Sequence, residues 1–167
     1  VSLPELKAFL RLDHAEEDAL LAGFLRTAAG MFEEFTGQVG LAQSKPARIP
    51  ADGVWHRLAP TPVRGLAGAQ GQSSDGVTVP LDLTEVELQI DFCGDGWARV
   101  DGNGAGLSSA LLTVDAGLAD SWNDLPEAVR QGIVRLAAHL YAQRDSGGSD
   151  SPASVAALWR PWRRMRL

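Results

Sequence analysis

Apolar residues near the N-terminus recur three or four positions apart, which predicts two amphipathic helices. The first spans about residues 3–12, where Ser2 and Glu5 have the spacing of a capping box. The second spans about residues 14–36 and ends at Gly37, a common helix stop. Its apolar face consists of Leu20, Leu21, Phe24, Leu25, Ala28, Phe32 and Phe35.

A second helical pattern lies near the C-terminus. It predicts a long helix over about residues 124–144, with Pro126 in its first turn. Its buried face consists of Leu125, Val129, Ile133, Leu136, Ala137 and Leu140. Ser154 is placed to begin a short final helix, which Pro161 ends or kinks.

The middle of the chain, about residues 38–121, has a different pattern. It holds most of the Gly and Pro residues, and turn-forming pairs separate its short apolar runs. The runs are Ala47–Ile49, Val54–Leu58, Val77–Val79, Val86–Phe92, Trp97–Val100 and Leu111–Val114. Residues 85–90 alternate between polar and apolar, as a half-buried strand does. These features predict a small, irregular antiparallel sheet with long loops.

Together the patterns predict an α+β fold that is mainly α. It would be a helical bundle of one short and two long helices, with a small irregular antiparallel β insertion over about 38–121 and an extended C-terminal arm. The main domain would span residues 1–144. The Ser/Gly/Asp-rich residues 145–151 would be a flexible linker, and residues 152–167 a docking arm.

Charge separates the C-terminal segment from the rest of the chain. The 167 residues suffice for one domain, and they carry a net charge of −6. All 21 acidic residues and 11 basic ones lie in residues 1–150, whereas residues 151–167 hold four Arg and no acid. An acidic body does not attract nucleic acid by bulk electrostatics. The basic segment instead indicates an arm that binds an acidic surface.

Other features exclude several classes of protein. No apolar run approaches the roughly 20 residues of a membrane helix, and the N-terminus lacks the pattern of a signal peptide. Cys93 is the only cysteine, so no intrachain disulfide can form, which fits a reducing cytoplasm. It has no base partner near it in the sequence and is interpreted as a structural thiol.

No candidate for catalysis or metal binding emerges from the residue pattern. The three histidines, His14, His56 and His139, are scattered without ligand spacing. The Gly-rich stretch 102–106 lacks the Gly-Lys-Ser/Thr ending of a phosphate loop and is interpreted as a flexible turn. The pairs Glu16–Glu17 and Glu33–Glu34 lie on a helix and are interpreted as solvated side chains. We therefore predict neither an enzyme nor a bound cofactor or metal.

The last ten residues, LWRPWRRMRL, hold two of the five Trp and four of the 15 basic residues. Trp and Arg are enriched at binding hot spots. Three interpretations stay open: the tail docks on a partner, it folds back on its own domain, or it contacts nucleic acid by Arg–aromatic stacking. The predicted partner-binding residues are Leu158, Trp159, Arg160, Trp162, Arg163, Arg164, Met165, Arg166 and Leu167.

Three stretches together resemble the head–tail connector (adaptor, or head-completion) proteins of long-tailed bacteriophages and related gene transfer agents. The first is LKAFLRLD at residues 6–13, followed by a helix ending in FEEFTG at 32–37. The second is LPEAV at 125–129, which opens a helix ending in LYAQR at 140–144. The third is the C-terminal LWRPWRRMRL, similar to the family's Leu-Leu-x-Pro-Tyr/Trp-Arg ending, although Trp159 stands where a Leu is common.

The resemblance implies a virion structural protein that forms a ring, commonly a dodecamer, below the portal. Helices would line a channel through which DNA passes without sequence-specific binding. The C-terminal arm would reach the portal, with Trp159 and Trp162 buried between portal subunits. The opposite face of the ring would meet a tail-proximal stopper or tail-completion protein. The protein would be made in the bacterial cytoplasm and located at the head–tail interface of a virion or phage-like particle. The alternative function is that of a nucleic-acid-binding adaptor that uses the Trp/Arg-rich tail.

Overall fold

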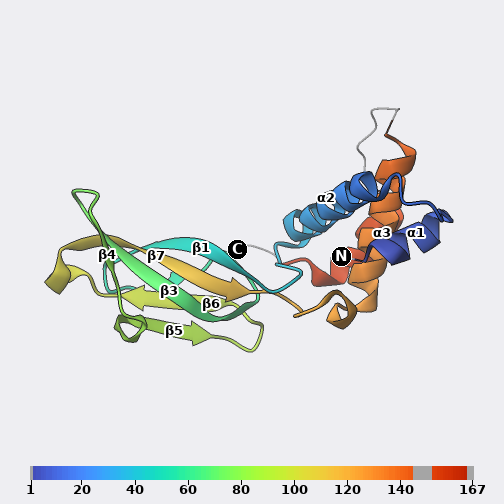
Figure 1. The fold of residues 1–167 in the computed structure, drawn as a ribbon. Coiled ribbons are helices and arrows are strands. Elements are labelled where there is room, and N and C mark those ends of the chain that lie inside the picture. The colour runs from blue at the N-terminus through green and yellow to red at the C-terminus, as the bar shows by residue number, and fades with distance from the viewer. Residues whose placement is uncertain (1, 145–151, 165–167) are drawn as a thin grey trace. The chain divides into compact units, whose positions relative to one another are not determined.

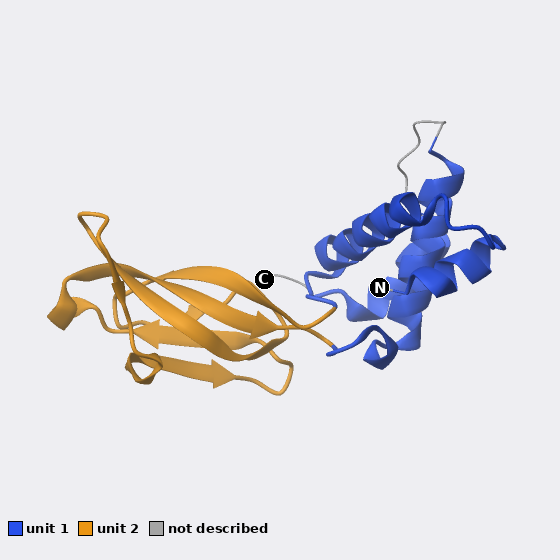
Figure 2. Ribbon diagram, in the orientation of Figure 1, with its two compact units in different colours: residues 1–40, 119–167 blue, residues 41–118 orange. Residues whose placement is uncertain are grey.

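The computed structural model describes residues 2–144 and 152–164, and it divides the chain into two compact units (Figure 2). Unit 1 comprises Val1–Gly40 and Ala119–Leu167, and unit 2 comprises Leu41–Leu118. The chain therefore begins in unit 1, builds the whole of unit 2, and returns to complete unit 1.

Unit 1 is helical (Figure 1). Its described residues form the helices α1 (Leu3–Leu10), α2 (Asp18–Thr36), α3 (Glu127–Ala142) and α4 (Ala153–Trp159), with 3-10 turns η3 (Trp122–Asp124) and η4 (Arg160–Trp162). Compared with the sequence-based bounds, α1 stops two residues earlier, α2 starts four residues later, and α3 is shorter at both ends. The apolar faces meet in one core that includes Leu6, Leu21, Leu25, Ala28, Phe32, Val129, Ile133, Leu136 and Trp159.

Local signals explain where these helices begin and end. Ser2 caps α1, because its Oγ accepts a hydrogen bond from the backbone N–H of Glu5 at 3.4 Å. Helix α1 ends because Arg11 takes a left-handed conformation, with φ 58° and ψ 43°. Helix α2 ends at Gly37, whose φ of 71° favours glycine and whose N–H donates to the Glu33 carbonyl at 2.8 Å.

Unit 2 is built from two antiparallel sheets. The first has the strand order β1-β7-β3-β4 and the second has the order β2-β6-β5. The strands are β1 (Gln43–Pro50), β2 (His56–Arg57), β3 (Val63–Ser73), β4 (Thr78–Pro80), β5 (Val86–Ile90), β6 (Gly96–Val100) and β7 (Leu107–Ala116), with 3-10 turns η1 (Leu83–Glu85) and η2 (Asn103–Ala105). The sheets approach closely where a Cβ on Gly96 would lie 2.5 Å from Val63. Their facing sides supply the core residues Ala47, Ile49, Val86, Ala98, Val100, Ala110, Leu112 and Val114.

Strand β1 is an edge strand that contains two prolines. The N–H of Ala51, which follows β1, donates to the Ser108 carbonyl at 3.2 Å, so in this register the odd-numbered N–H groups point towards β7. Pro46 and Pro50 occupy even-numbered positions on the outer edge. Neither proline therefore removes a hydrogen bond from the β1–β7 ladder.

The predicted fold class, a mainly α helical bundle with a small β insertion, is wrong. Seven strands in two sheets make residues 41–118 a complete β unit. The pattern of β3 concealed this, because three register shifts along it interrupt any regular alternation of apolar and polar residues. The predicted extended arm is also wrong for the described residues 152–164, which form α4 and η4.

Candidate functional site

The C-terminal segment, residues 152–164, was the candidate site from the sequence, and it is folded. Helix α4 begins after Pro152, whose carbonyl accepts a hydrogen bond from the Val155 N–H at 2.9 Å. Ser154 therefore lies inside the helix and does not cap it. Pro161 lies in η4, directly after the end of α4. Val155 is fully buried, so the segment contributes to the core of unit 1.

Trp159 anchors this segment inside unit 1, with only 2% of its surface exposed. Its ring meets Phe32 edge-on, with centroids 5.4 Å apart and planes at 75°, and it lies 6.1 Å from the ring of Phe35. Its Nε1 donates a hydrogen bond to the Val129 carbonyl at 3.4 Å. The apolar surface of the indole is therefore buried, and its N–H is hydrogen-bonded, within its own chain.

Gly132 makes room for this indole on α3. A Cβ at Gly132 would lie 2.0 Å from Trp159 Nε1, which no side chain tolerates without movement. A glycine within a helix costs about 1 kcal/mol relative to alanine. Its place in the middle of a helical pattern was a signal of close packing that sequence reasoning did not use.

The turn after α4 is held by the C-terminal end of α2. The N–H of Arg164 donates to the Thr36 carbonyl at 2.8 Å, and the Gln38 side chain donates to the carbonyl of Trp162. Thr36 is itself buried: its Oγ1 donates to the Phe32 carbonyl at 2.7 Å and accepts from the Gln38 N–H at 3.2 Å. Neither Thr36 nor Gln38 was a candidate from the sequence.

The predicted partner-binding residues differ in how far they reach solvent. Arg160 and Arg163 are exposed, whereas Leu158, Trp162 and Arg164 are half-buried. Arg163 lies over the ring of Phe35, 5.7 Å from its centroid. Within residues 2–144 and 152–164, neither Arg160 nor Arg163 has an acidic partner. Met165, Arg166 and Leu167 lie outside the described residues, as does the predicted linker 145–151.

These positions correct one expectation and leave another as a prediction. Trp159 is not an exposed anchor, because α2 and α3 enclose it. For residues 152–164 the structure has the arrangement in which the tail folds back on its own unit. Binding of a partner by the remaining tail residues stays a prediction.

The scattered histidines do not come together. Within the described ranges, no group of three or more His, Cys, Asp or Glu side chains could hold a metal ion. His56 instead pairs with Asp52, with 2.8 Å between Nε2 and Oδ1. This hydrogen bond, together with one from the Val54 N–H, lowers the pKa of Asp52 below its ordinary value of 3.8.

The structure also bears on the Gly-rich stretch and on membrane-spanning segments. The Gly-rich residues 102–106 form η2 and the turn into β7, not a loop that leads into an α-helix. In the part of the chain that the structure describes, no helix is long and apolar enough to cross a membrane.

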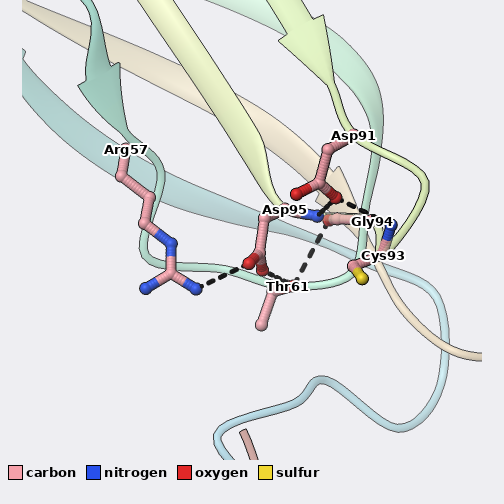
Figure 3. A network of polar contacts seen from close by, with 6 residues as sticks. All are labelled: Arg57, Thr61, Asp91, Cys93, Gly94 and Asp95. Atoms are coloured by element: carbon pink, nitrogen blue, oxygen red, sulfur yellow. Dashed lines mark hydrogen bonds and ion pairs between the residues drawn. The ribbon is translucent and has the colours of Figure 1, made fainter. Parts of the chain in front are cut away.

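A second candidate site lies at the tip of the β5–β6 hairpin, residues 91–95 (Figure 3). Asp91 Oδ1 accepts hydrogen bonds from the N–H groups of Cys93 and Asp95 at 2.8 and 2.9 Å. Asp95 in turn pairs with Arg57 at 2.9 Å. Phe92, at this tip, is fully exposed. The sequence placed Phe92 at the end of a strand, so its exposure was missed.

Comparisons with known proteins find similar solved structures but no matching family model or curated sequence. The chain matches no family model and no curated protein sequence. Its structure is similar to a chain from the neck of an empty gene transfer agent (GTA) particle computed with C6 symmetry, with a TM-score of 0.76 and 25% identity. That match covers 100% of this chain and 91% of the other. The chain has the fold of a gene transfer agent neck protein.

Two further structures agree with this neck-protein fold. A chain from the virion of a native GTA particle matches with a TM-score of 0.76 and 27% identity, covering 100% of this chain and 91% of that one. A chain from the neck of a native GTA particle, computed with C12 symmetry, has a TM-score of 0.72 and 24% identity over 99% of this chain and 89% of that one, and it shows the fold alone.

The resemblance expected from the sequence is confirmed by these neighbours. All three are parts of gene transfer agent particles, and two come from the neck. They agree with the predicted location at the head–tail interface of a phage-like particle. The neck-protein fold includes unit 2, because the matches cover nearly the whole chain.

Proposed function

We propose that the protein is a structural subunit of the neck of a phage-like particle and joins the DNA-containing head to the tail. The observation that carries this proposal is the full-length match to GTA neck chains at a TM-score of 0.76. The neighbours are components of particles, and we assign no catalytic activity to this chain.

The finer proposal is a ring of like copies, commonly twelve, below the portal. The C6 and C12 symmetry of the two neck structures supports a ring of multiple copies. The acidic character of residues 1–150 supports a channel that lets DNA pass without binding it, since like charges repel. The tail side of the ring would meet a stopper or tail-completion protein.

The C-terminal segment is proposed to bind the portal in two parts. Trp159 fixes the root of the segment in unit 1, and the residues after it make the contact. Exposed Arg160 and Arg163 have no acidic partner among the described residues, so they would form ion pairs with carboxylates on the portal. Leu158, Trp162, Arg164, Met165, Arg166 and Leu167 would add the remaining contacts. Repetition around a ring strengthens weak contacts through multivalency.

The test uses the full chain and the portal protein of the same particle. The variant Arg160→Glu/Arg163→Glu is expected to remain folded and to bind the portal at least about tenfold more weakly, since the two charges are reversed. The matched control, Arg26→Glu/Arg135→Glu, reverses two exposed arginines elsewhere in unit 1 and is expected to bind normally. Unchanged portal binding by the first variant would refute this docking assignment.

A truncation sharpens the same test. Removing residues 160–167 keeps Trp159 and its contacts, and it is expected to leave a folded chain without portal binding. Removing residues 152–167 would also delete buried Val155 and Trp159, so loss of binding would then be confounded by loss of stability.

The alternative function is a nucleic-acid-binding adaptor that uses the same arginines and Trp162. Their exposure next to a half-buried indole favours it, because Arg and aromatic side chains stack on single-stranded bases. This alternative requires an affinity for single-stranded DNA that falls steeply with salt. A gel-shift experiment at low salt that shows no complex would exclude it.

A further inference from the structure

Phe92 is the most exposed large apolar side chain among the described residues. Its exposure is 101%, whereas the other exposed large apolar side chains lie between 37% and 58%. Burial of Phe92 therefore contributes nothing to the stability of this chain. A fully exposed aromatic side chain at a loop tip is available for a contact with another molecule.

Several independent contacts fix the backbone around Phe92 (Figure 3). The Asp91 carboxylate accepts two backbone hydrogen bonds, and the Gly94 N–H donates to the Asp91 carbonyl at 2.9 Å. The Thr61 hydroxyl lies 3.0 Å from Asp95 Oδ1, and Arg57 pairs with the other oxygen of the same carboxylate. The tip is therefore held in one shape while the Phe92 ring takes no part in holding it.

Gly94 ties the tip to the first sheet. Its φ is 82°, and a Cβ there would lie 2.6 Å from the Pro62 side chain, so only glycine fits. Its carbonyl accepts a hydrogen bond from the Val63 N–H at 2.7 Å. An anchor on such a preorganised backbone loses little conformational entropy on binding.

Charge restricts which surface the tip can meet. Unit 2 carries five basic and nine acidic side chains, a net charge of −4, and the tip itself contains two aspartates. Contact between the unit 2 surfaces of two copies would bring like charges together. Unit 1, by contrast, carries ten basic and twelve acidic side chains, a net charge of −2, so it repels the tip less than unit 2 does.

We infer that Phe92 anchors the hairpin tip of one copy on unit 1 of a second copy of this chain. This inference rests on the proposed function, in which like copies stand next to each other around an axis. The C6 and C12 symmetry of the structural neighbours supports adjacency of like chains. Because the two surfaces differ, the contact is head-to-tail and can close into a ring.

The first experiment measures self-association of the full chain over a concentration series by analytical ultracentrifugation. Phe92→Ala is expected to raise the dissociation constant between copies by about 30-fold or more, as for a hot-spot aromatic. The matched control is Phe9→Ala, which removes a 52% exposed phenylalanine from α1. It is expected to change the dissociation constant between copies less than about threefold. Both variants are checked for an unchanged circular dichroism spectrum.

The outcomes separate this inference from the proposed function. Assembly of Phe92→Ala at wild-type concentrations would overturn the anchor while leaving the ring intact. A wild-type chain that stays monomeric at all concentrations would overturn both the ring and the anchor.

A second experiment identifies what covers Phe92. Replacing its ring with the photo-crosslinking residue p-benzoylphenylalanine keeps an aromatic side chain at the tip. Illumination of the assembled chain is expected to yield dimers of this chain that are joined to a peptide of unit 1. If the crosslinks in whole particles join only to a different protein or to lipid, the second copy is excluded as the occupant.

Discussion

Trp159 in unit 1 and Phe92 in unit 2 are the two aromatic residues whose surroundings differ most from their sequence context. Trp159 lies among arginines but is 2% exposed, and Phe92 follows an apolar strand but is fully exposed. Trp159 is buried because Gly132 leaves a space for its ring on α3. Phe92 lies at a hairpin tip that is held by hydrogen bonds of the residues around it, and its own ring makes none of these contacts. Partners distant in sequence bury Trp159, whereas the turn that exposes Phe92 is held by its neighbour Asp91 as well as by the distant residues Thr61 and Arg57.

The largest effect is expected from Trp159→Ala, which should lower the free energy of unfolding by about 3–5 kcal/mol, because it leaves a cavity against Phe32 and removes the hydrogen bond to the Val129 carbonyl. Urea denaturation measures this change. Trp97→Ala is the control, since Trp97 is 39% exposed on β6 and should cost less than half as much. Equal costs for the two variants would contradict the assignment of Trp159 to the core.

Gly132→Ala tests the space on α3 directly. Although alanine favours helices, the added methyl group would collide with the indole, and we expect a loss of about 1–3 kcal/mol. Gly30→Ala on α2 is the matched control: no atom lies within 4 Å of its Cβ position, so it should stabilise the protein by about 0.5–1 kcal/mol. Opposite signs in thermal unfolding support the packing; a stabilised Gly132→Ala variant would refute it.

Thr36→Val should lower the free energy of unfolding by about 1–2 kcal/mol, because it leaves the Gln38 N–H without its hydroxyl acceptor in a buried site. Thr27→Val, at an exposed position on the same helix, should change little. If urea denaturation gives Thr36→Val the same free energy of unfolding as the wild type, the Thr36 hydroxyl does not stabilise the end of α2.

The smallest effect concerns pH and unit 2. The pKa of Asp52 is lowered in the folded state, so its contribution to stability is present above the unfolded value of 3.8 and is lost as the pH falls through the folded value. Asp52→Asn should therefore reduce the slope of stability against pH below about 4. A variant whose slope matches the wild type between pH 4 and 2 would show that the His56 pair does not couple to folding.

The sequence predicted the helices of unit 1 better than the sheets of unit 2. Helix periodicity and local stops such as Gly37 depend on nearby residues and are visible in the chain. Strand β3 contains three Gly and three register shifts, so its strand character comes from pairing with β7, which follows 34 residues after β3 ends. The sequence of β1 likewise contains two prolines, which are acceptable only because the strand lies at an edge.

The candidate site was only partly visible in the sequence for the same reason. Arg160 and Arg163 could be predicted as exposed from their charge. The burial of Trp159 depends on Gly132 and on the end of α2, which are 27 and more than 100 positions away. The turn that exposes Phe92 is held by Asp91 together with Thr61 and Arg57. Thr61 and Arg57 come close to this turn only in the folded chain.

The prolines on the outer edge of β1 have a consequence for how the chain behaves at high concentration. An uncovered strand edge offers N–H groups to which a strand from another molecule can add, and this is a route to fibrils. Pro46 and Pro50 remove two of the donors on that edge without weakening the native ladder. Growth of the sheet from one molecule into the next is therefore hindered along this edge even at high protein concentration.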